Sequence, residues 1–276
     1  MLPLSTPAMV AEAAPTAVAA SPLVAEQCLN CEQPLATGPF CPSCGQQRPH
    51  RLSTAHVLHE LVHVFTHADK SIFGYAGQVL LHPGRVVADY LRGRRKHYFN
   101  PFQFLLIMVG LVTTAGLLLH FYEGTGAGVV QSMAKHGVSA ERLARVSKYF
   151  AYISKYHNVW WLLLLLPLYS LVTWGMYRRR LNFAEAFFVH VVIGSAFHVL
   201  LLLAMLPILW LTKGQPGNQA SLFQSVVVCG YLVAIGRQAL GLSWGGAFWR
   251  AVAVVVLGIA LSWQLNGLVF RWYVFG

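Results

Sequence analysis

The stretch RGRRKHYFNPFQFLLIMVGLVTTAGLLLHF, residues 92–121, decides the fold of this chain. It begins with a cluster of Lys and Arg, and the residues that follow Asn100 are almost all apolar. A helix of about 20 apolar residues is long enough to cross the hydrocarbon core of a bilayer, which is roughly 30 Å thick. Because Lys and Arg near the end of a span favour the cytoplasmic side, the stretch predicts a membrane helix that begins in the cytoplasm.

The rest of the chain has the same apolar character. Of its 276 residues, 56% are hydrophobic and 11% are charged, whereas about a quarter of an ordinary soluble domain is charged. We predict five spans, at about Phe102 to Phe121, Val159 to Tyr177, Ala186 to Leu211, Ala220 to Ile235 and Ala247 to Phe270. The fourth is short and contains Gln224 and Ser225, so it is the weakest. The predicted fold class is an all-α polytopic membrane protein of about five transmembrane helices.

The positions of Lys and Arg along the chain predict its orientation. If the N-terminal region is cytoplasmic, 13 of these residues lie inside and seven lie outside. We expect the basic run before the first span to contact phosphate headgroups of anionic lipid, with a specific lipid or RNA site as the alternative. The run consists of Arg92, Arg94, Arg95 and Lys96. The net charge of +11 therefore indicates a membrane surface, and no nucleic acid is expected as a partner.

The loop after the first predicted span contains SAERLARVSKYFAYISKY, residues 139–156. Its apolar residues recur at helical spacing, and Lys and Arg lie between them. Trp160 and Trp161 follow after three further residues, as expected for an aromatic belt at a membrane interface. The pattern predicts an amphipathic helix that rests on the outer leaflet.

A second motif, CLNCEQPLATGPFCPSCGQ at residues 28–46, holds two C-x-x-C pairs. The pairs are Cys28 with Cys31 and Cys41 with Cys44. Four thiolates suit tetrahedral Zn²⁺, and so short a segment needs the metal to fold, so we predict a structural zinc ribbon. A rubredoxin-like redox iron and a dithiol switch are the alternatives. Gly45 permits a tight turn after the second pair, whereas Glu32 makes the first turn less favourable.

The segment between the ribbon and the first span is predicted to form amphipathic juxtamembrane helices. His59, His63 and His67 are four residues apart, so a helix places them on one face. One interpretation is a second metal site or a pH sensor, because imidazole binds metals and titrates near neutral pH. The other is a solvated face of an interfacial helix. The predicted division is a disordered leader (1–27), a zinc ribbon (28–47), juxtamembrane helices (53–100) and a transmembrane bundle (101–276).

Three segments carry a resemblance to a known family. They are FCPSCGQ in the cysteine motif, HADKSIFG at residues 67–74, and LLHPGRVVADYLRGRRKHYFNPFQFLL at residues 80–106. In this order they resemble the bacterial membrane proteins grouped as domain of unknown function 3667. The resemblance covers about residues 28 to 110 and implies a multi-span protein of the bacterial inner membrane. It assigns no activity, and it carries over only the four cysteines as metal ligands.

Function is less well determined by the sequence than the fold is. His190 and His198 lie on one stripe of the third predicted span, where polar residues are costly and often functional. Buried histidines that hydrogen-bond between helices are the alternative. No phosphate loop, Ser/His/Asp arrangement or carboxylate pair is recognisable, so an enzyme is not expected. We expect an adaptor or regulatory protein whose ribbon engages a cytosolic partner, with a small-molecule transporter or permease component as the alternative; the oligomeric state is not predicted.

Overall fold

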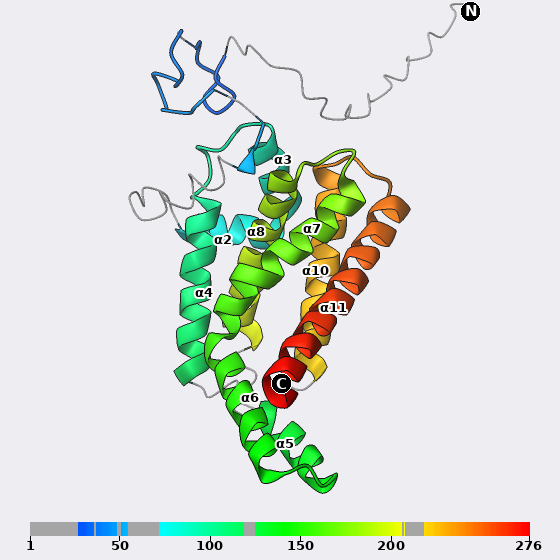
Figure 1. Cartoon of the computed structure of the whole chain (residues 1–276). Helices are drawn as coiled ribbons and strands as arrows, with labels where there is room; N and C mark the ends of the chain where they lie inside the picture. Colours follow the sequence, from blue (N-terminus) through cyan, green and yellow to red (C-terminus); the bar gives the residue numbers. More distant parts are fainter. Residues whose placement is uncertain are drawn as a thin grey trace, which may run out of the picture.

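The computed structural model describes residues 27–35, 37–48, 51–54, 72–118, 125–205, 207 and 218–276. Most of this part of the chain is helical (Figure 1). The helices are α2 (Ile72–Leu81), α3 (Pro83–Leu91), α4 (Pro101–Leu118), α5 (Thr125–Lys135), α6 (Ala140–Trp160), η2 (Trp161–Leu165), α7 (Leu166–Tyr177), α8 (Phe183–Leu200), η3 (Leu201–Met205), α10 (Asn218–Gln238) and α11 (Trp244–Phe275). Within the described ranges, strand pairing is limited to two isolated bridges in the N-terminal head.

Four of the described helical segments are long and apolar enough to cross a membrane. They are Pro101–Leu118, Lys155–Tyr177, Phe183–Leu203 and Trp244–Phe275. The predicted fourth span corresponds to α10, whose apolar part, Leu222–Gln238, is shorter than these. The all-helical membrane fold class is therefore confirmed, with four candidate spans among the described residues and a shorter apolar helix where the fourth span was predicted.

The helix predicted in the outer loop is present as the first part of α6. Inside α6 the backbone leaves helical geometry at Tyr156, where φ is −110° and ψ is 15°, so a kink lies between the charged part and the second span, which begins at Lys155. Residues 140–166 contain no Gly or Pro, so neither of these residue types causes the kink. α6 projects beyond the bundle together with α5 (Figure 1).

Two short π-helical segments, η2 and η3, interrupt the second and third spans. Each ends two residues before a proline, namely Pro167 and Pro207. A proline lacks the N–H that would donate to the carbonyl four residues earlier, and its ring crowds that carbonyl. A wider π turn accommodates this conflict without ending the helix.

An aromatic core joins α2 and α3 to the bundle. The Tyr90 ring stacks on Phe188 of α8 with the ring centroids 4.0 Å apart, and Tyr75 contacts Phe104 edge to face at 4.9 Å. Tyr75, Phe104 and Phe188 are almost fully buried. The two short helices are therefore packed against α8 and α4 by their own aromatic side chains.

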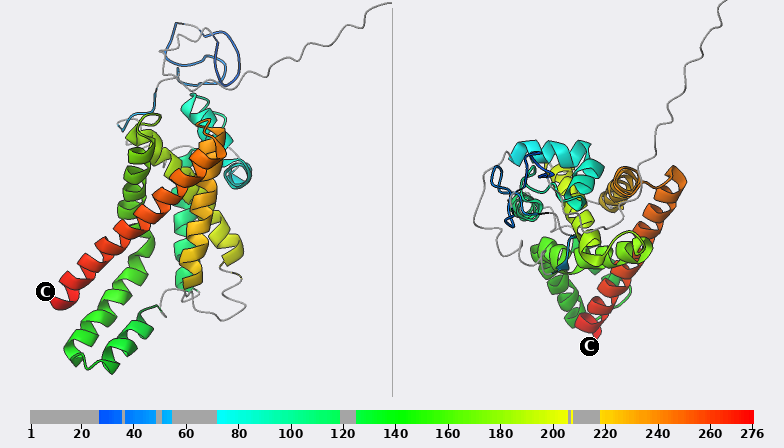
Figure 2. Two further views of the ribbon diagram at one scale, coloured as in Figure 1. Left: turned by 90° about the vertical axis from the view of Figure 1, so that its right-hand side faces the viewer. Right: turned by 90° about the horizontal axis from the view of Figure 1, so that it is seen from above.

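Most of the connecting segments that are rich in Arg and Lys lie at one end of the bundle. The cysteine-containing head, α3, the start of α4, the turn from α7 to α8 and the turn from α10 to α11 all lie at this end (Figures 1 and 2). The Arg180 guanidinium donates to the carbonyl of Leu240, which joins the last two turns directly. We call this the head end of the bundle; α5 and the C-terminus lie at the opposite end.

Candidate metal centre and bundle cavity

The four cysteines of the head converge on one point. The sulfur atoms of Cys28 and Cys44 are 3.6 Å apart, and so are those of Cys31 and Cys41. All four sulfurs lie within 4.8 Å of one another, and the cysteines are free of disulfides. A tetrahedral ion with metal–sulfur bonds of about 2.3 Å needs sulfurs about 3.8 Å apart. The cluster therefore has the dimensions of a site that could hold a metal ion.

The two C-x-x-C turns have the same backbone structure. In the first, the N–H of Glu32 donates to the carbonyl of Cys28 at 2.7 Å; in the second, the N–H of Gly45 donates to the carbonyl of Cys41 at 2.9 Å. Glu32 has a φ of +61° and Gly45 a φ of +68°. Glu32 thus adopts the left-handed conformation that glycine adopts in the second turn, although that conformation is unfavourable for a residue with a side chain.

Two thiols of the head, those of Cys31 and Cys41, have pKa values shifted in opposite directions. The backbone N–H of Cys44 donates to the Cys41 sulfur and lowers the pKa of Cys41 to about 6. The backbone at Gln33 favours the thiolate of Cys31, but burial and the neighbouring sulfurs outweigh it and raise the pKa of Cys31 to about 12. Four thiolates this close repel one another, so their joint ionisation requires a cation between them.

The head is hydrogen-bonded to the start of the bundle. Gln46, two residues after the last cysteine, is buried, and its side-chain oxygen accepts from the backbone N–H of Lys96 at 2.8 Å. The Arg51 guanidinium donates to both carboxylate oxygens of Glu185, at 2.9 and 3.1 Å. The Asn182 amide donates to the carbonyl of Leu52 at 2.8 Å. These contacts join the head and the segment after it to the basic run before α4 and to the start of α8.

The four basic residues before α4 differ in their surroundings. Arg92 and Lys96 are exposed, whereas Arg94 and Arg95 are half-buried. The Arg95 side chain donates to the carbonyl of Tyr90 and lies over its ring at 5.3 Å. Arg92 and Lys96 are thus the two whose charged ends face outward.

Two of the predicted features lie outside the described residues. These are the histidine stripe of His59, His63 and His67, and the leader up to residue 26. The second-metal and pH-sensor interpretations therefore stay predictions.

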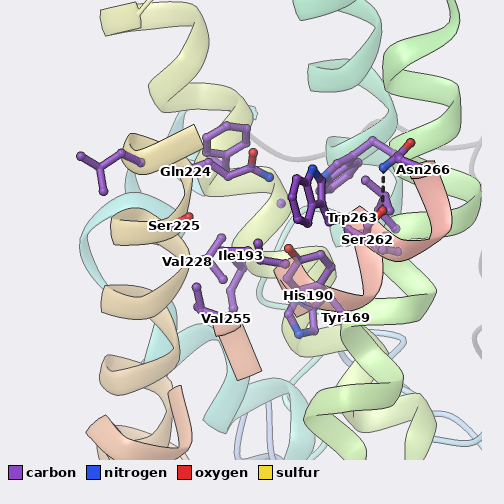
Figure 3. A pocket seen from close by; sticks show the side chains of 17 residues that line it. Tyr169, His190, Ile193, Gln224, Ser225, Val228, Val255, Ser262, Trp263 and Asn266 are labelled. Atoms are coloured by element: carbon purple, nitrogen blue, oxygen red, sulfur yellow. Dashed lines mark hydrogen bonds between the residues drawn. The ribbon is translucent and has the colours of Figure 1, made fainter. Parts of the chain in front are cut away.

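A cavity of about 460 Å³ lies between η2, α7, α8, α10 and α11 (Figure 3). It is lined by Trp161, Leu165, Leu166, Tyr169, His190, Ile193, Gly194, Phe197, Leu222, Gln224, Ser225, Val228, Val255, Ile259, Ser262, Trp263 and Asn266. The volume lies within the range typical of small-molecule sites. The sequence pointed to His190, Gln224 and Ser225 as polar residues within predicted spans, but it did not indicate that five helical segments surround a cavity.

The two histidines of α8 have separate environments. His190 lines the cavity, and its Nε2 lies 2.7 Å from the Thr173 hydroxyl of α7. His198 does not line the cavity; its Nδ1 bonds the carbonyl of Gly194, and its ring packs against Trp161 at 4.9 Å. The structure therefore brings His190, but not His198, to the cavity.

These observations define the chain as a helical polytopic membrane protein with a four-cysteine head at one end of its bundle. Residues 76–113, from α2 to within α4, match the model of the family described as Protein of unknown function (DUF3667). The family resemblance expected from the sequence is thereby confirmed, and the chain is related to this family through the segment that joins the head to the first span. No curated protein and no solved structure matches the chain.

Proposed function

We propose that the protein is a multi-pass adaptor of the bacterial inner membrane, whose zinc-bound head lies in the cytoplasm and engages a cytosolic partner protein. The observation that carries this proposal is the attachment of the head to the bundle. Gln46 reaches from the second cysteine turn to the backbone of Lys96, next to the first span. A head held in this way presents its outer face at a fixed position relative to the membrane.

Zinc is the metal that best suits the head. Four thiolates in a tetrahedron favour Zn²⁺ over the harder ions Mg²⁺ and Ca²⁺, which prefer oxygen ligands. With Cys28, Cys31, Cys41 and Cys44 as ligands, the metal has no open position for a substrate. Its contribution is therefore structural: it would hold the two turns together in a segment too short to form a hydrophobic core.

The cytoplasmic position of the head is supported by the distribution of charge. The head end of the bundle carries the basic run before α4, the triplet Arg178 to Arg180 and Arg237. Lys and Arg concentrate on the cytoplasmic side of inner-membrane proteins. Arg92 and Lys96, whose side chains are exposed, are the best placed to contact anionic headgroups.

The outer face of the head offers an anchor for a partner protein. The Phe40 side chain is 55% exposed although it directly precedes Cys41. Pro39 and Pro42, which are close to it in the sequence, are also exposed. Exposed aromatic residues on a rigid support are frequent anchors of protein interfaces.

The test uses the full-length protein in intact cells with a photoreactive amino acid at position 40. We expect a discrete crosslinked protein, and we expect it to disappear when Cys41→Ser and Cys44→Ser are introduced together. The same photoreactive residue at Tyr152, exposed on α6 at the other end, is the control and should not give this product. Unchanged crosslinking in the double variant, or none at position 40, would contradict the adaptor proposal.

A further inference from the structure

The bundle cavity has no role in the adaptor function, yet its lining has a definite chemistry. Residues such as Ile193, Val228 and Val255 make most of the wall apolar. The polar contributions come from uncharged groups and from His190. No Asp, Glu, Lys or Arg is among the described lining residues. Because an ionised ligand buried without a counter-charge is strongly unfavourable, such a wall selects an uncharged molecule.

The polar groups are concentrated between α10 and α11. The Asn266 amide donates to the carbonyl of Ser262 at 2.8 Å, and the Ser262 hydroxyl donates to the carbonyl of Gly258 at 2.7 Å. The Asn266 side-chain oxygen remains available as an acceptor, whereas the Ser262 hydroxyl is also hydrogen-bonded to the Tyr169 side chain. The Gln224 amide lies across from them (Figure 3), and it has no hydrogen-bond partner within the described part of the chain. A ligand with hydroxyl groups would satisfy the Gln224 amide and the Asn266 oxygen and would lie beside Ser262.

The cavity reaches the surface of the bundle. Trp263 and Leu222 line it, but they are 82% and 66% exposed, and they lie on helices of the bundle. Trp263 belongs to the candidate span Trp244–Phe275, whose exposed side chains would face hydrocarbon when the helix crosses a membrane. A ligand can therefore enter from the bilayer without passing through an aqueous phase.

Two glycines shape the wall by admitting aromatic rings. A Cβ at Gly194 would lie 2.6 Å from the Trp161 ring, and a Cβ at Gly258 would lie 2.2 Å from the Tyr169 ring. Trp161 is also the first residue of η2, and π segments occur frequently at functional sites. The rings lie against the helices at these two points.

From this arrangement we infer that the cavity binds one uncharged amphiphile from the bilayer, with its apolar chain between α8 and α11 and its hydroxyl-bearing end at Gln224, Ser262 and Asn266. The volume corresponds to a single-chain molecule rather than to a whole phospholipid. The inference is independent of the adaptor function, because none of these residues belongs to the head.

The test uses the purified full-length protein in nanodiscs and a photoreactive monoacylglycerol with a diazirine on its chain. Labelled positions are mapped by mass spectrometry, and unlabelled monoacylglycerol is added as a competitor. Val228→Trp fills the cavity, and Gln224→Leu removes the unpartnered amide at similar volume. Gly230→Ala is the matched control on the same helix, because a Cβ there meets nothing within 4 Å. A photoreactive phosphatidic acid of equal chain length provides the charged comparison.

In the wild type we expect saturable labelling at the cavity-facing residues of α10 and α11. Val228→Trp should reduce it about tenfold, the effect of losing roughly 1.4 kcal/mol of binding free energy, and Gly230→Ala should leave it unchanged. Gln224→Leu should reduce labelling by the monoacylglycerol and should not increase labelling by the phosphatidic acid. Labelling that does not saturate, or equal labelling by phosphatidic acid, would overturn the inference. If Val228→Trp fails to fold, the inference is tested by the competition with unlabelled monoacylglycerol and by the labelling of the Gln224→Leu variant.

Discussion

At the scale of single residues, the first cysteine turn of the head adopts an unfavourable backbone conformation. Glu32 and Gly45 occupy equivalent positions after the two cysteine pairs, and both have a positive φ. A residue with a Cβ loses roughly 1 kcal/mol in this region relative to glycine. The turn at Glu32 is nevertheless formed, because the hydrogen bond to Cys28 and the converging sulfurs fix its geometry.

Replacing Glu32 with glycine should therefore stabilise the head. The φ of +61° is retained without steric cost, and we expect a gain of about 1 kcal/mol in the metal-bound state, or about fivefold slower loss of metal to a chelator. Competition between the full-length protein and a chromogenic chelator measures this effect. Gly45→Ala is the opposite control: its Cβ meets only the end of the Lys96 side chain at 3.7 Å, so any loss of metal affinity reports backbone strain. A Glu32→Gly protein that releases metal faster would contradict this account.

The sequence predicted contacts between side chains well where the two residues are close along the chain. The spacing of Cys28, Cys31, Cys41 and Cys44 was sufficient to indicate a cluster, because each pair curls within four residues. The partner of Glu185 could not be predicted in the same way. Its carboxylate binds Arg51, which lies 134 residues earlier, and only the packing of the bundle brings the two together.

At the scale of elements, the start of α8 is hydrogen-bonded to the segment that follows the head. Asn182 caps the helix by accepting from the N–H of Glu185 at 2.8 Å, and Glu185 accepts in return from the N–H of Asn182 at 2.7 Å. The same two side chains hold Arg51 and the carbonyl of Leu52. A helix cap therefore also fixes the segment that follows the head.

We expect Glu185→Ala to destabilise this junction by about 1–2 kcal/mol. Most of the loss comes from the capping box, because the ion pair with the half-exposed Arg51 contributes little. Thermal unfolding of the purified protein in detergent and faster hydrogen exchange at residues 51–54 measure the change. Glu141→Ala, which removes an exposed pair with Arg145, is the control and should change stability by less than about 0.5 kcal/mol. Equal effects of the two substitutions would argue against a special role for the α8 cap.

The crossing of α3 and α10 depends on a glycine in the family-matched segment. A Cβ at Gly84 would lie 2.4 Å from the side-chain oxygen of Gln238 and 2.6 Å from its Cβ. We expect Gly84→Ala to lower the unfolding free energy by about 1–3 kcal/mol, the cost of overpacking a close contact. Gly77→Ala on α2 has open space around it and should be neutral or slightly stabilising. Thermal unfolding of both variants separates the two cases, and a neutral Gly84→Ala would show that the helices can move apart freely.

Element-scale prediction succeeded for the positions of the apolar helices and was incomplete for the junctions between them. Hydropathy detected the span that ends at Tyr177, and helical spacing detected the amphipathic part of α6, but neither predicted that the two are joined through a kink at Tyr156 without a loop. Before Pro167 the π segment η2 accommodates the missing hydrogen bond, so the helix does not end there. The cavity was not predictable either, because its wall depends on Trp161 and Tyr169 fitting against Gly194 and Gly258 on other helices.

At the scale of the whole molecule, α10 decides the topology, because its apolar part is shorter than the four candidate spans. Its apolar part, Leu222–Gln238, is about 26 Å long at 1.5 Å per residue, against roughly 30 Å of hydrocarbon. A mismatch of a few Å costs only fractions of a kcal/mol per Å. Arg237 lies over the Trp244 ring at 4.6 Å and donates to the carbonyl of Leu242 at 2.7 Å, which fixes the basic turn at the head end. We therefore expect α10 to cross the membrane.

If α10 crosses, the C-terminus lies on the side opposite the head, because α11 returns across the bundle from the head end. We expect a green fluorescent protein fused after Gly276 to be dark in a bacterial host and alkaline phosphatase at the same position to be active. The fluorescent protein should be bright when fused at the N-terminus, and also when fused after Leu240 in a chain that ends at the turn between α10 and α11. A bright C-terminal fusion together with a bright Leu240 fusion would mean that α11 does not leave the cytoplasm. A dark Leu240 fusion would mean that this turn lies outside, contrary to the positions of Arg178 to Arg180 and Arg237 at the head end.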